Sequence, residues 1–264
     1  MNLDLNNDPD AARRAADQMA VCLARELWDG ERVFHGVNSP LPMVAIFLAR
    51  KLHAPHSVLI EVAGSVDPEP EGLPFSTNDP KLCEGAASLF SNADAYDLFS
   101  RGGVDLLFLG GAQIDKAGRV NMSYIGDPAQ PKVRLPGGGG GSVIMEQARR
   151  VVIWRVVHDV RTFVSKLDFV TQTGNLTRIV TPLAVLELIE GGLEIESAHP
   201  GVSAVEVAAN TGFALDASRK ISVTAPPTQD ELAALEVIDP EGVRYSEFSA
   251  LRRVKRWDDE MLRW

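Results

Sequence analysis

The sequence is poor in cysteine, and it has no apolar run long enough to cross a bilayer. Its two cysteines, Cys22 and Cys83, stand far apart and outside any Cys-x-x-Cys pair, so neither a disulfide framework nor a zinc knuckle is indicated. Its apolar stretches stay short of the roughly 20 residues that a membrane span needs. Residues 1–18 are polar and acidic, unlike a signal peptide. We therefore expect a cytoplasmic protein.

Positive charge is also scarce, and several common site signatures are missing. There are 26 Lys and Arg against 36 Asp and Glu, a net charge of −10, which argues against nucleic acid as the main partner. The five histidines show neither His-x-His nor His-x-x-x-His spacing, so no metal site is expected. The chain also lacks the Gly-Lys-Ser/Thr of a P-loop, the glycine fingerprint of a dinucleotide site and the Gly-x-Ser-x-Gly of a hydrolase.

What the sequence does have is an alternation of helix-like and strand-like segments. Helical spacing predicts helices at residues 8–29, 41–52, 93–101, 142–150, 202–210 and 230–238, and apolar runs predict strands at 32–36, 58–62, 104–109, 151–158 and 169–170. Residues 183–189 and 193–197 are expected to form further short elements, of a type left open. This order predicts an α/β fold with a parallel sheet covered by helices. We expect one domain over residues 1–264, with an irregular segment at 65–80 and a mobile, charged tail from 252.

The most unusual feature is a run of five glycines, here called the glycine loop: Gly137, Gly138, Gly139, Gly140 and Gly141. Glycine loses more backbone entropy on folding than any other residue, so such a run persists where something must approach the main chain closely. The loop stands between a predicted strand and a predicted helix, where α/β folds present N–H groups to a ligand. One interpretation is a backbone wall for a thioester or carboxylate, and the other is a flexible surface loop.

Two polar residues stand where predicted strands end, which is where open α/β sheets place their ligands. Glu61 ends an otherwise apolar strand, so desolvation would raise the pKa of its carboxyl, as suits a nucleophile or a general base. The alternative is a solvated Glu at the sheet edge. Gln113 follows Gly110 and Gly111, and its amide could donate to a developing oxyanion or simply bond to the backbone of a tight turn.

Six segments, in order along most of the chain, together resemble a known family. They are residues 35–55, 58–67, 107–127, 131–142, 199–213 and 237–242, and they are similar to the β-type subunit of class I CoA-transferases, most closely the glutaconate CoA-transferase-like branch. The resemblance implies a doubly wound, mostly parallel sheet flanked by helices, and an α-type partner subunit in a heterodimer or heterotetramer. It also implies an active site at the interface between the subunits.

The resemblance implies further that coenzyme A enters as part of the substrate, with no cofactor bound permanently. The substrate is then expected to contact residues at the ends of the predicted strands and in the glycine loop. Outside that loop, they are Asn38, Ser39, Gly64, Ser65, Gly110 and Gly111.

One departure from the family pattern changes the expected chemistry. In the transferases, a Glu before the glycine turn attacks the thioester, but Val62 stands at that place here and Glu61 lies one residue earlier. Neighbouring side chains on a strand point to opposite faces, and a valine cannot form a covalent intermediate. Related subunits without this Glu include a decarboxylase of isovalerate biosynthesis, whose Gly-Ser-Leu-Asp-Pro-Glu run resembles residues 64–69, and a hydrolase that opens the last steroid rings.

The favoured hypothesis is therefore a subunit of an enzyme that hydrolyses an acyl-CoA or cleaves a C–C bond in it, decarboxylation included. Two alternatives stay open. A β-bulge near Glu61 could shift the register by one residue and restore a CoA-transferase. The chain could also be a non-catalytic subunit.

Overall fold

The computed structural model describes residues 5–218 and 220–251. Its centre is a ten-stranded sheet in the order β14-β13-β12-β11-β10-β5-β1-β2-β3-β4. The five middle strands are parallel. They are β11 (Leu176–Val180), β10 (Arg150–Trp154), β5 (Leu106–Leu109), β1 (Arg32–His35) and β2 (Val58–Ile60).

The edges of the sheet are mostly antiparallel. They are formed by β12 (Ala184–Ile189) and β13 (Gly192–Ala198) on one side, and by β3 (Ser65–Val66) and β4 (Ser88–Leu89) on the other. The short strand β14 (Ser222–Val223) pairs parallel to β13. The predicted mostly parallel sheet is thus confirmed.

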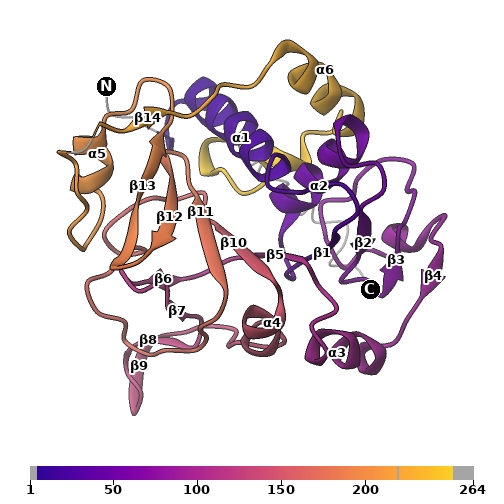
Figure 1. Cartoon of the computed structure of the whole chain (residues 1–264), viewed down its shortest axis with the longest axis horizontal. Helices are drawn as coiled ribbons and strands as arrows, with labels where there is room; N and C mark the ends of the chain where they lie inside the picture. The colour runs from indigo at the N-terminus through magenta and orange to yellow at the C-terminus, as the bar shows by residue number, and fades with distance from the viewer. Residues whose placement is uncertain (1–4, 219, 252–264) are drawn as a thin grey trace, which may run out of the picture.

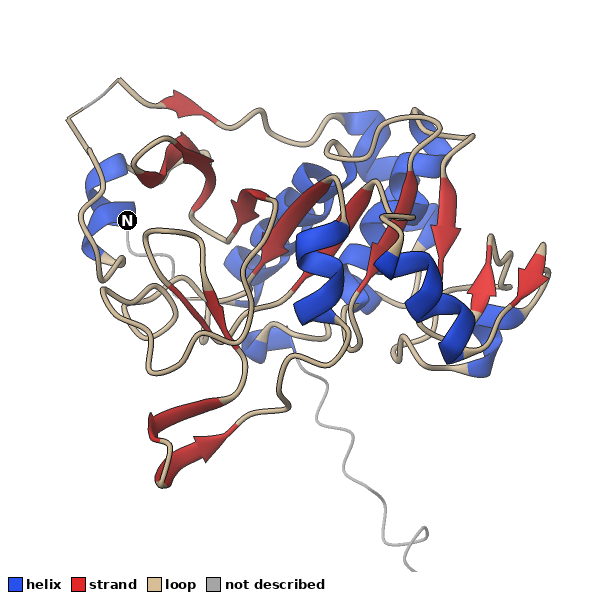
Figure 2. Cartoon of the chain, turned by 60° about the horizontal axis from the view of Figure 1, so that its bottom comes forward, coloured by secondary structure: helices blue, strands red, loops and turns tan. Residues whose placement is uncertain are grey.

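Helices cover both faces of this sheet (Figures 1 and 2). One layer holds α1 (Pro9–Ala24), α2 (Pro40–Leu52) and α6 (Gln229–Ile238), and the other holds α3 (Asn92–Ser100) and α4 (Gly141–Gln147). Strand β5 divides its side chains between the two cores: Leu106 and Phe108 join the first, and Leu107 and Leu109 the second. This is the two-residue period of a strand that is buried on both faces.

The remaining elements lie outside these layers. Two antiparallel pairs, β6 (Gln113–Ile114) with β7 (Val120–Asn121) and β8 (Tyr124–Asp127) with β9 (Gln130–Arg134), follow β5, and the second pair projects from the body as a hairpin (Figure 2). Helix α5 (Ala204–Ala209) contacts β13. Three short 3-10 helices cover Pro80–Cys83, Val243–Tyr245 and Ser249–Leu251.

Helix boundaries follow the capping signals in the sequence. The carboxylate of Asp8 accepts the N–H groups of Asp10 and Ala11, and Pro9 opens α1. The helix ends at Ala24, five residues before the predicted end, because residues 25–30 turn toward β1 instead. No strand forms at 169–170, so that prediction was wrong, and the predicted tail from 252 lies outside the described residues.

The strand order creates a crevice between β1 and β5. The chain passes from β1 through α2 to β2, and then returns to place β5 on the other side of β1. Such a reversal opens a crevice at the carboxyl ends of the two strands, where α/β proteins bind ligands. Gly36 follows β1, and its N–H donates to the C=O of Phe108 on β5 (3.0 Å). None of the helices within residues 5–218 and 220–251 has the length and apolar character of a membrane span.

Candidate functional site

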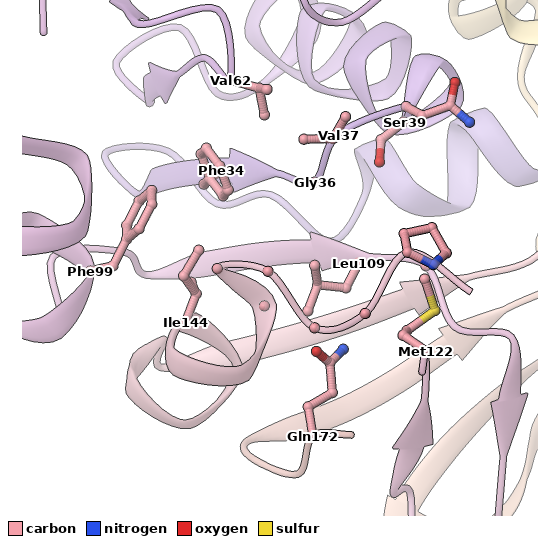
Figure 3. Close-up of a pocket in the computed structure, with 18 of the residues that line it drawn as sticks. Phe34, Gly36, Val37, Ser39, Val62, Phe99, Leu109, Met122, Ile144 and Gln172 are labelled. Atoms are coloured by element: carbon pink, nitrogen blue, oxygen red, sulfur yellow. The ribbon is translucent and has the colours of Figure 1, made fainter. Parts of the chain in front are cut away.

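A cavity of about 730 Å³ lies at the carboxyl ends of β1, β2 and β5. Its walls are largely aromatic and aliphatic, with Phe34, Phe90, Phe99, Leu109, Met122 and Ile144 among them (Figure 3). Polar side chains also line it, among them Asn38, Asn92 and Arg155. Apolar walls with polar groups between them are typical of a pocket that binds a small organic molecule and fixes its orientation through hydrogen bonds.

Most of the sequence-predicted site residues do line this cavity. They are Asn38, Ser39, Glu61, Val62, Gly110, Gly111 and the whole glycine loop. Ser39 stands at the N-cap of α2, but its side chain makes no capping hydrogen bond.

The five glycines of the glycine loop each have a physical reason. Gly137 and Gly139 have φ values of 92° and 50°, in the left-handed region that side chains disfavour. At the other three positions a Cβ would meet a neighbour: Thr171 at 3.0 Å from Gly138, Tyr96 at 3.2 Å from Gly140, and Gln172 at 2.7 Å from Gly141. The loop is therefore a packed wall of the cavity.

The main chain of the glycine loop keeps unused hydrogen-bond donors. Gly137 N–H donates to Met122 C=O (2.7 Å), and Gly141 N–H donates to Gly138 C=O (2.8 Å). For the N–H groups of Gly138, Gly139 and Gly140, the part of the chain that the structure describes provides no acceptor. Consecutive free N–H groups suit an oxyanion or a carboxylate.

Glu61 and Val62 directly follow β2, and their side chains point to opposite sides. The side chain of Val62 points into the cavity (Figure 3) and packs against the same core as Ile60 and Phe34. The β1–β2 pairing runs from Arg32 opposite Val58 to Phe34 opposite Ile60 without a bulge. Strand alternation therefore continues to Glu61 and sends its side chain toward the other core.

The Glu61 carboxylate pairs with the imidazole of His35, and both side chains are fully buried. His35 Nε2 lies 2.9 Å from Glu61 Oε2, although neither carboxylate oxygen has an aligned donor among the described residues. Burial lowers the pKa of His35, but the Glu61 charge outweighs it, so the net pKa is raised above the usual value. The geometry is that of a buried ion pair beneath the cavity wall.

Three of the predicted site residues are not among those that line the cavity. The amide of Gln113 is held by Asp168 Oδ2, to which Nε2 donates (3.0 Å), and by Asn121 Nδ2, which donates to Oε1 (2.7 Å). The fully buried Ser65 donates to the C=O of Leu82. Gly64 has a φ of 94°, and its C=O accepts the N–H of Phe90 (2.9 Å). Gln113, Gly64 and Ser65 shape the loops beside the cavity instead.

Known proteins share the fold and much of the sequence of this chain. The sequence model of the family described as "Coenzyme A transferase" matches residues 16–210, well over half of the chain. This chain belongs to the coenzyme A transferase family.

Three relatives of this coenzyme A transferase family member stand out. One of the two subunits of 3-oxoadipate CoA-transferase of Pseudomonas knackmussii is 36% identical, over 84% of this chain and 92% of that protein. The corresponding subunit of glutaconate CoA-transferase of Acidaminococcus fermentans is 27% identical, over 85% and 92%. A chain of the crystal structure of the decarboxylase AibA/AibB is 33% identical with a TM-score of 0.84, over 89% of this chain and 99% of that one.

Reasoning from the sequence missed several cavity residues of this coenzyme A transferase family member. Asn78, Asn92 and Tyr96 come from the segments that precede and form α3, and Arg155 follows β10. Burial lowers the pKa of the Arg155 guanidinium from its usual value. Gln172 also lines the cavity. No motif marks these residues, because segments far apart in the sequence converge here.

Nothing in the described ranges 5–218 and 220–251 gathers three His, Cys, Asp or Glu side chains that could hold a metal ion. The cavity of this coenzyme A transferase family member instead offers backbone N–H groups, amides and apolar walls. These groups can hold an uncharged or anionic organic substrate and shield it from water.

Proposed function

We propose that this chain is the β-type subunit of a heteromeric enzyme that acts on an acyl-CoA thioester by decarboxylation or hydrolysis, and not by CoA transfer. The observation that carries the proposal is the orientation at the end of β2. Val62 faces the cavity, while the Glu61 carboxylate is buried 2.9 Å from His35 Nε2.

Transfer of CoA through an enzyme-bound thioester needs a carboxylate within reach of the substrate. Val62 has no nucleophilic atom, and Glu61 would have to leave its ion pair with His35 to attack. Breaking a buried pair leaves an uncompensated charge, which costs about 3–5 kcal/mol. A covalent route through Glu61 would therefore begin with an unfavourable rearrangement.

Of the two non-transfer reactions, the apolar wall around Val62 favours decarboxylation over hydrolysis. A carboxylate bound among Phe34, Val62 and Phe99 loses its hydration, which weakens the charged ground state relative to the departing neutral CO₂. As the C–C bond breaks, its electron pair moves toward the thioester and forms an enolate, which then takes a proton at carbon. The free N–H groups of the glycine loop suit that enolate oxygen. The 33% identity to a decarboxylase chain supports this order of preference.

The proposed partner is an α-type subunit that covers the cavity. Both CoA-transferase relatives described above are named as single subunits of their enzymes. Val37 and Tyr96 line the cavity and are 64% and 46% exposed, which is a large apolar exposure for side chains at a binding site. We propose that the partner buries them and supplies the acid that delivers the final proton.

The proposal is tested with the chain assembled with its α-type partner. A panel of acyl-CoA esters, with and without a distal carboxylate, is incubated with no acceptor acid, and the products are separated by mass. We expect free CoA, or an acyl-CoA that is lighter by CO₂, to form without any acceptor. If turnover of every ester requires an added carboxylic acid, the proposal is wrong.

Covalent trapping supplies the matched control. Borohydride treatment during turnover should leave Glu61 unmodified in the wild-type complex. The Val62→Glu variant places a carboxylate on the cavity wall, and we expect it to yield a borohydride-reducible adduct at residue 62. The Val62→Ile variant keeps the wall apolar and should yield none. A reduced Glu61 in the wild-type enzyme would establish transfer.

A further inference from the structure

Gln172 is a buried polar residue that none of the chemistry above uses. It lies between β10 and β11, and its backbone forms a two-way bridge with Val120: Val120 N–H donates to Gln172 C=O (3.0 Å), and Gln172 N–H donates back (3.2 Å). On one side, the Thr171 hydroxyl accepts the N–H of Met122 (2.8 Å). On the other side, a Cβ at Gly174 would come within 2.0 Å of Met145 C=O. The segment is thus held firmly in place.

The side-chain amide of Gln172 has no hydrogen-bond partner within the described residues. Only 5% of the residue is exposed, and Oε1 is buried without a donor. Figure 3 shows the amide beneath the glycine loop, directed toward it. Leaving a buried amide unpaired costs about 1–3 kcal/mol, so a native protein keeps one where a ligand completes it.

Gln172 lies on the side of the cavity that the glycine loop forms. Val62, the place of the family nucleophile, lies across the cavity from Gln172 in Figure 3. Gln172 is instead adjacent to Gly141, where a Cβ would lie 2.7 Å from its Oε1. An amide so placed contacts the substrate beside the glycine loop and across the cavity from Val62.

We propose that Gln172 is a substrate-positioning residue, whose side-chain Nε2 donates a hydrogen bond to an uncharged acceptor of the acyl-CoA, because Oε1 is closed off beside Gly141. Two parts of an acyl-CoA away from the thioester offer such an acceptor: a secondary amide of the pantetheine arm and a hydroxyl on the acyl group. This inference rests on the proposed function for its substrate class, but not on which reaction follows binding.

The test measures binding and turnover by the assembled enzyme, in which Gln172→Met removes the hydrogen bonds and keeps the length of the side chain. Binding uses a non-reactive thioether analogue of the acyl-CoA, so it is independent of the reaction. We expect Gln172→Met to weaken binding and to lower kcat/KM by about 10-fold to 100-fold. The matched control is Gln147→Met on the exposed end of α4, which should change neither. Gln172→Glu, of nearly the same shape, guards against a packing defect in the Met variant.

The two sources of the polar group are distinguished by truncated substrates. A simple alkyl thioester has no pantetheine amide. If Gln172 contacts the pantetheine arm, Gln172→Met and wild type should have equal kcat/KM values with this substrate. A hydroxyl contact predicts that the difference persists with hydroxylated acyl chains and vanishes with their deoxy analogues. If Gln172 has only a structural role, Gln172→Met should lower kcat/KM for all substrates by the same factor, and that result overturns the proposal. So does unchanged binding in both Gln172 variants, which would leave the proposed function intact. Failure of the wild-type enzyme to bind any acyl-CoA analogue would overturn both.

Discussion

At the scale of single residues, one step along the chain just after β2 separates an apolar cavity wall from a buried carboxylate. Val62 and Glu61 are neighbours, yet the first faces the cavity and the second faces His35. The Glu61 carboxylate lies 2.9 Å from His35 Nε2, so we expect it to stabilise the folded protein and not to react with a substrate. Replacing Glu61 should therefore lower the free energy of unfolding, whereas replacing a catalytic nucleophile would chiefly lower turnover.

Replacing Glu61 by Gln should therefore destabilise the protein. The change leaves His35 buried without its counter-charge, and we expect the free energy of unfolding to fall by about 3–5 kcal/mol. Urea denaturation measures this loss. The matched control is Glu71→Gln at an exposed position, which should stay within about 0.5 kcal/mol of wild type. A stable Glu61→Gln protein that has lost all turnover would instead indicate a nucleophile.

The pH dependence of this pair has a definite sign. The pKa of His35 is raised in the folded state. The contribution of His35 protonation to the free energy of unfolding is therefore fully present below the unfolded pKa of about 6.5. The contribution is lost as the pH rises through the folded pKa. The free energy of unfolding of Glu61→Gln should accordingly fall furthest below that of wild type at pH values under about 6.5, where His35 is protonated.

At the scale of elements, the glycine loop is a fitted wall, and its fit can be tested at one position. A Cβ at Gly141 would lie 2.7 Å from Gln172 Oε1, so Gly141→Ala must displace either the loop or the amide. We expect kcat/KM for acyl-CoA to fall at least about 10-fold, with little change in melting temperature. Steady-state kinetics and thermal denaturation measure the two effects.

Gly30→Ala is the matched control for the glycine loop. Gly30 has a φ of 82°, and no atom lies within 4 Å of a Cβ there, so the substitution strains a turn away from the cavity. It should cost roughly 1 kcal/mol of stability and leave kcat/KM unchanged. Full activity in Gly141→Ala would show that the loop tolerates a side chain and does not shape the site.

The elements that the sequence predicts well are those with a strong local pattern. Residues 104–109 are apolar with a single interruption at Asp105 and contain β5. Asp8-Pro9 opens α1 as expected, and α2 begins at Pro40, one residue before the predicted start. Strand β11 escaped prediction because its sequence, Leu-Thr-Arg-Ile-Val, mixes polar and apolar side chains. Its place beside β10 is set by tertiary pairing, which a local pattern does not contain.

The site was predictable only where a residue carries its own signal. Five glycines in a row, and a lone glutamate beside a valine at the end of an apolar predicted strand, stand out in the sequence itself. Gln113 does not reach the cavity because Asp168, 55 residues later, holds its amide. Gln172 lines the cavity because β7 and the glycine loop bracket it. Partners so distant along the chain decide which of the two glutamines lines the cavity.

At the scale of the whole molecule, two buried histidines join the ends of strands that lie far apart in the sequence. His158, after β10, lies between the hydroxyls of Thr181 (2.8 Å) and Thr211 (3.0 Å). His199, after β13, lies 2.8 Å from Thr181 C=O and 3.0 Å from the Thr224 hydroxyl. Burial lowers the pKa of His158 to about 3 and that of His199 to about 4. Both are neutral in the folded protein at neutral pH.

These histidines should make the fold sensitive to mild acid. In the unfolded chain they take up protons near pH 6.5, whereas the folded chain resists protonation down to about pH 4. The free energy of unfolding should thus fall by about 1 kcal/mol per pH unit for each histidine as the pH drops from 6.5 toward 4. His35 adds nothing to this slope well below pH 6.5, because its raised pKa keeps the folded protein protonated there and the unfolded chain is protonated there as well.

Urea denaturation at pH 7, 6 and 5 separates this effect from the titration of carboxylates, most of which occurs below pH 5. The His199→Gln variant keeps hydrogen-bonding groups but cannot be protonated, so it should lose stability less steeply with acid than wild type. His56→Gln, at an 80% exposed histidine paired with Asp29, should keep the wild-type slope. If the free energy of unfolding falls equally steeply with acid in His199→Gln and in wild type, the prediction is wrong. His199 would then not be kept neutral in the folded protein by its burial against Thr181 and Thr224.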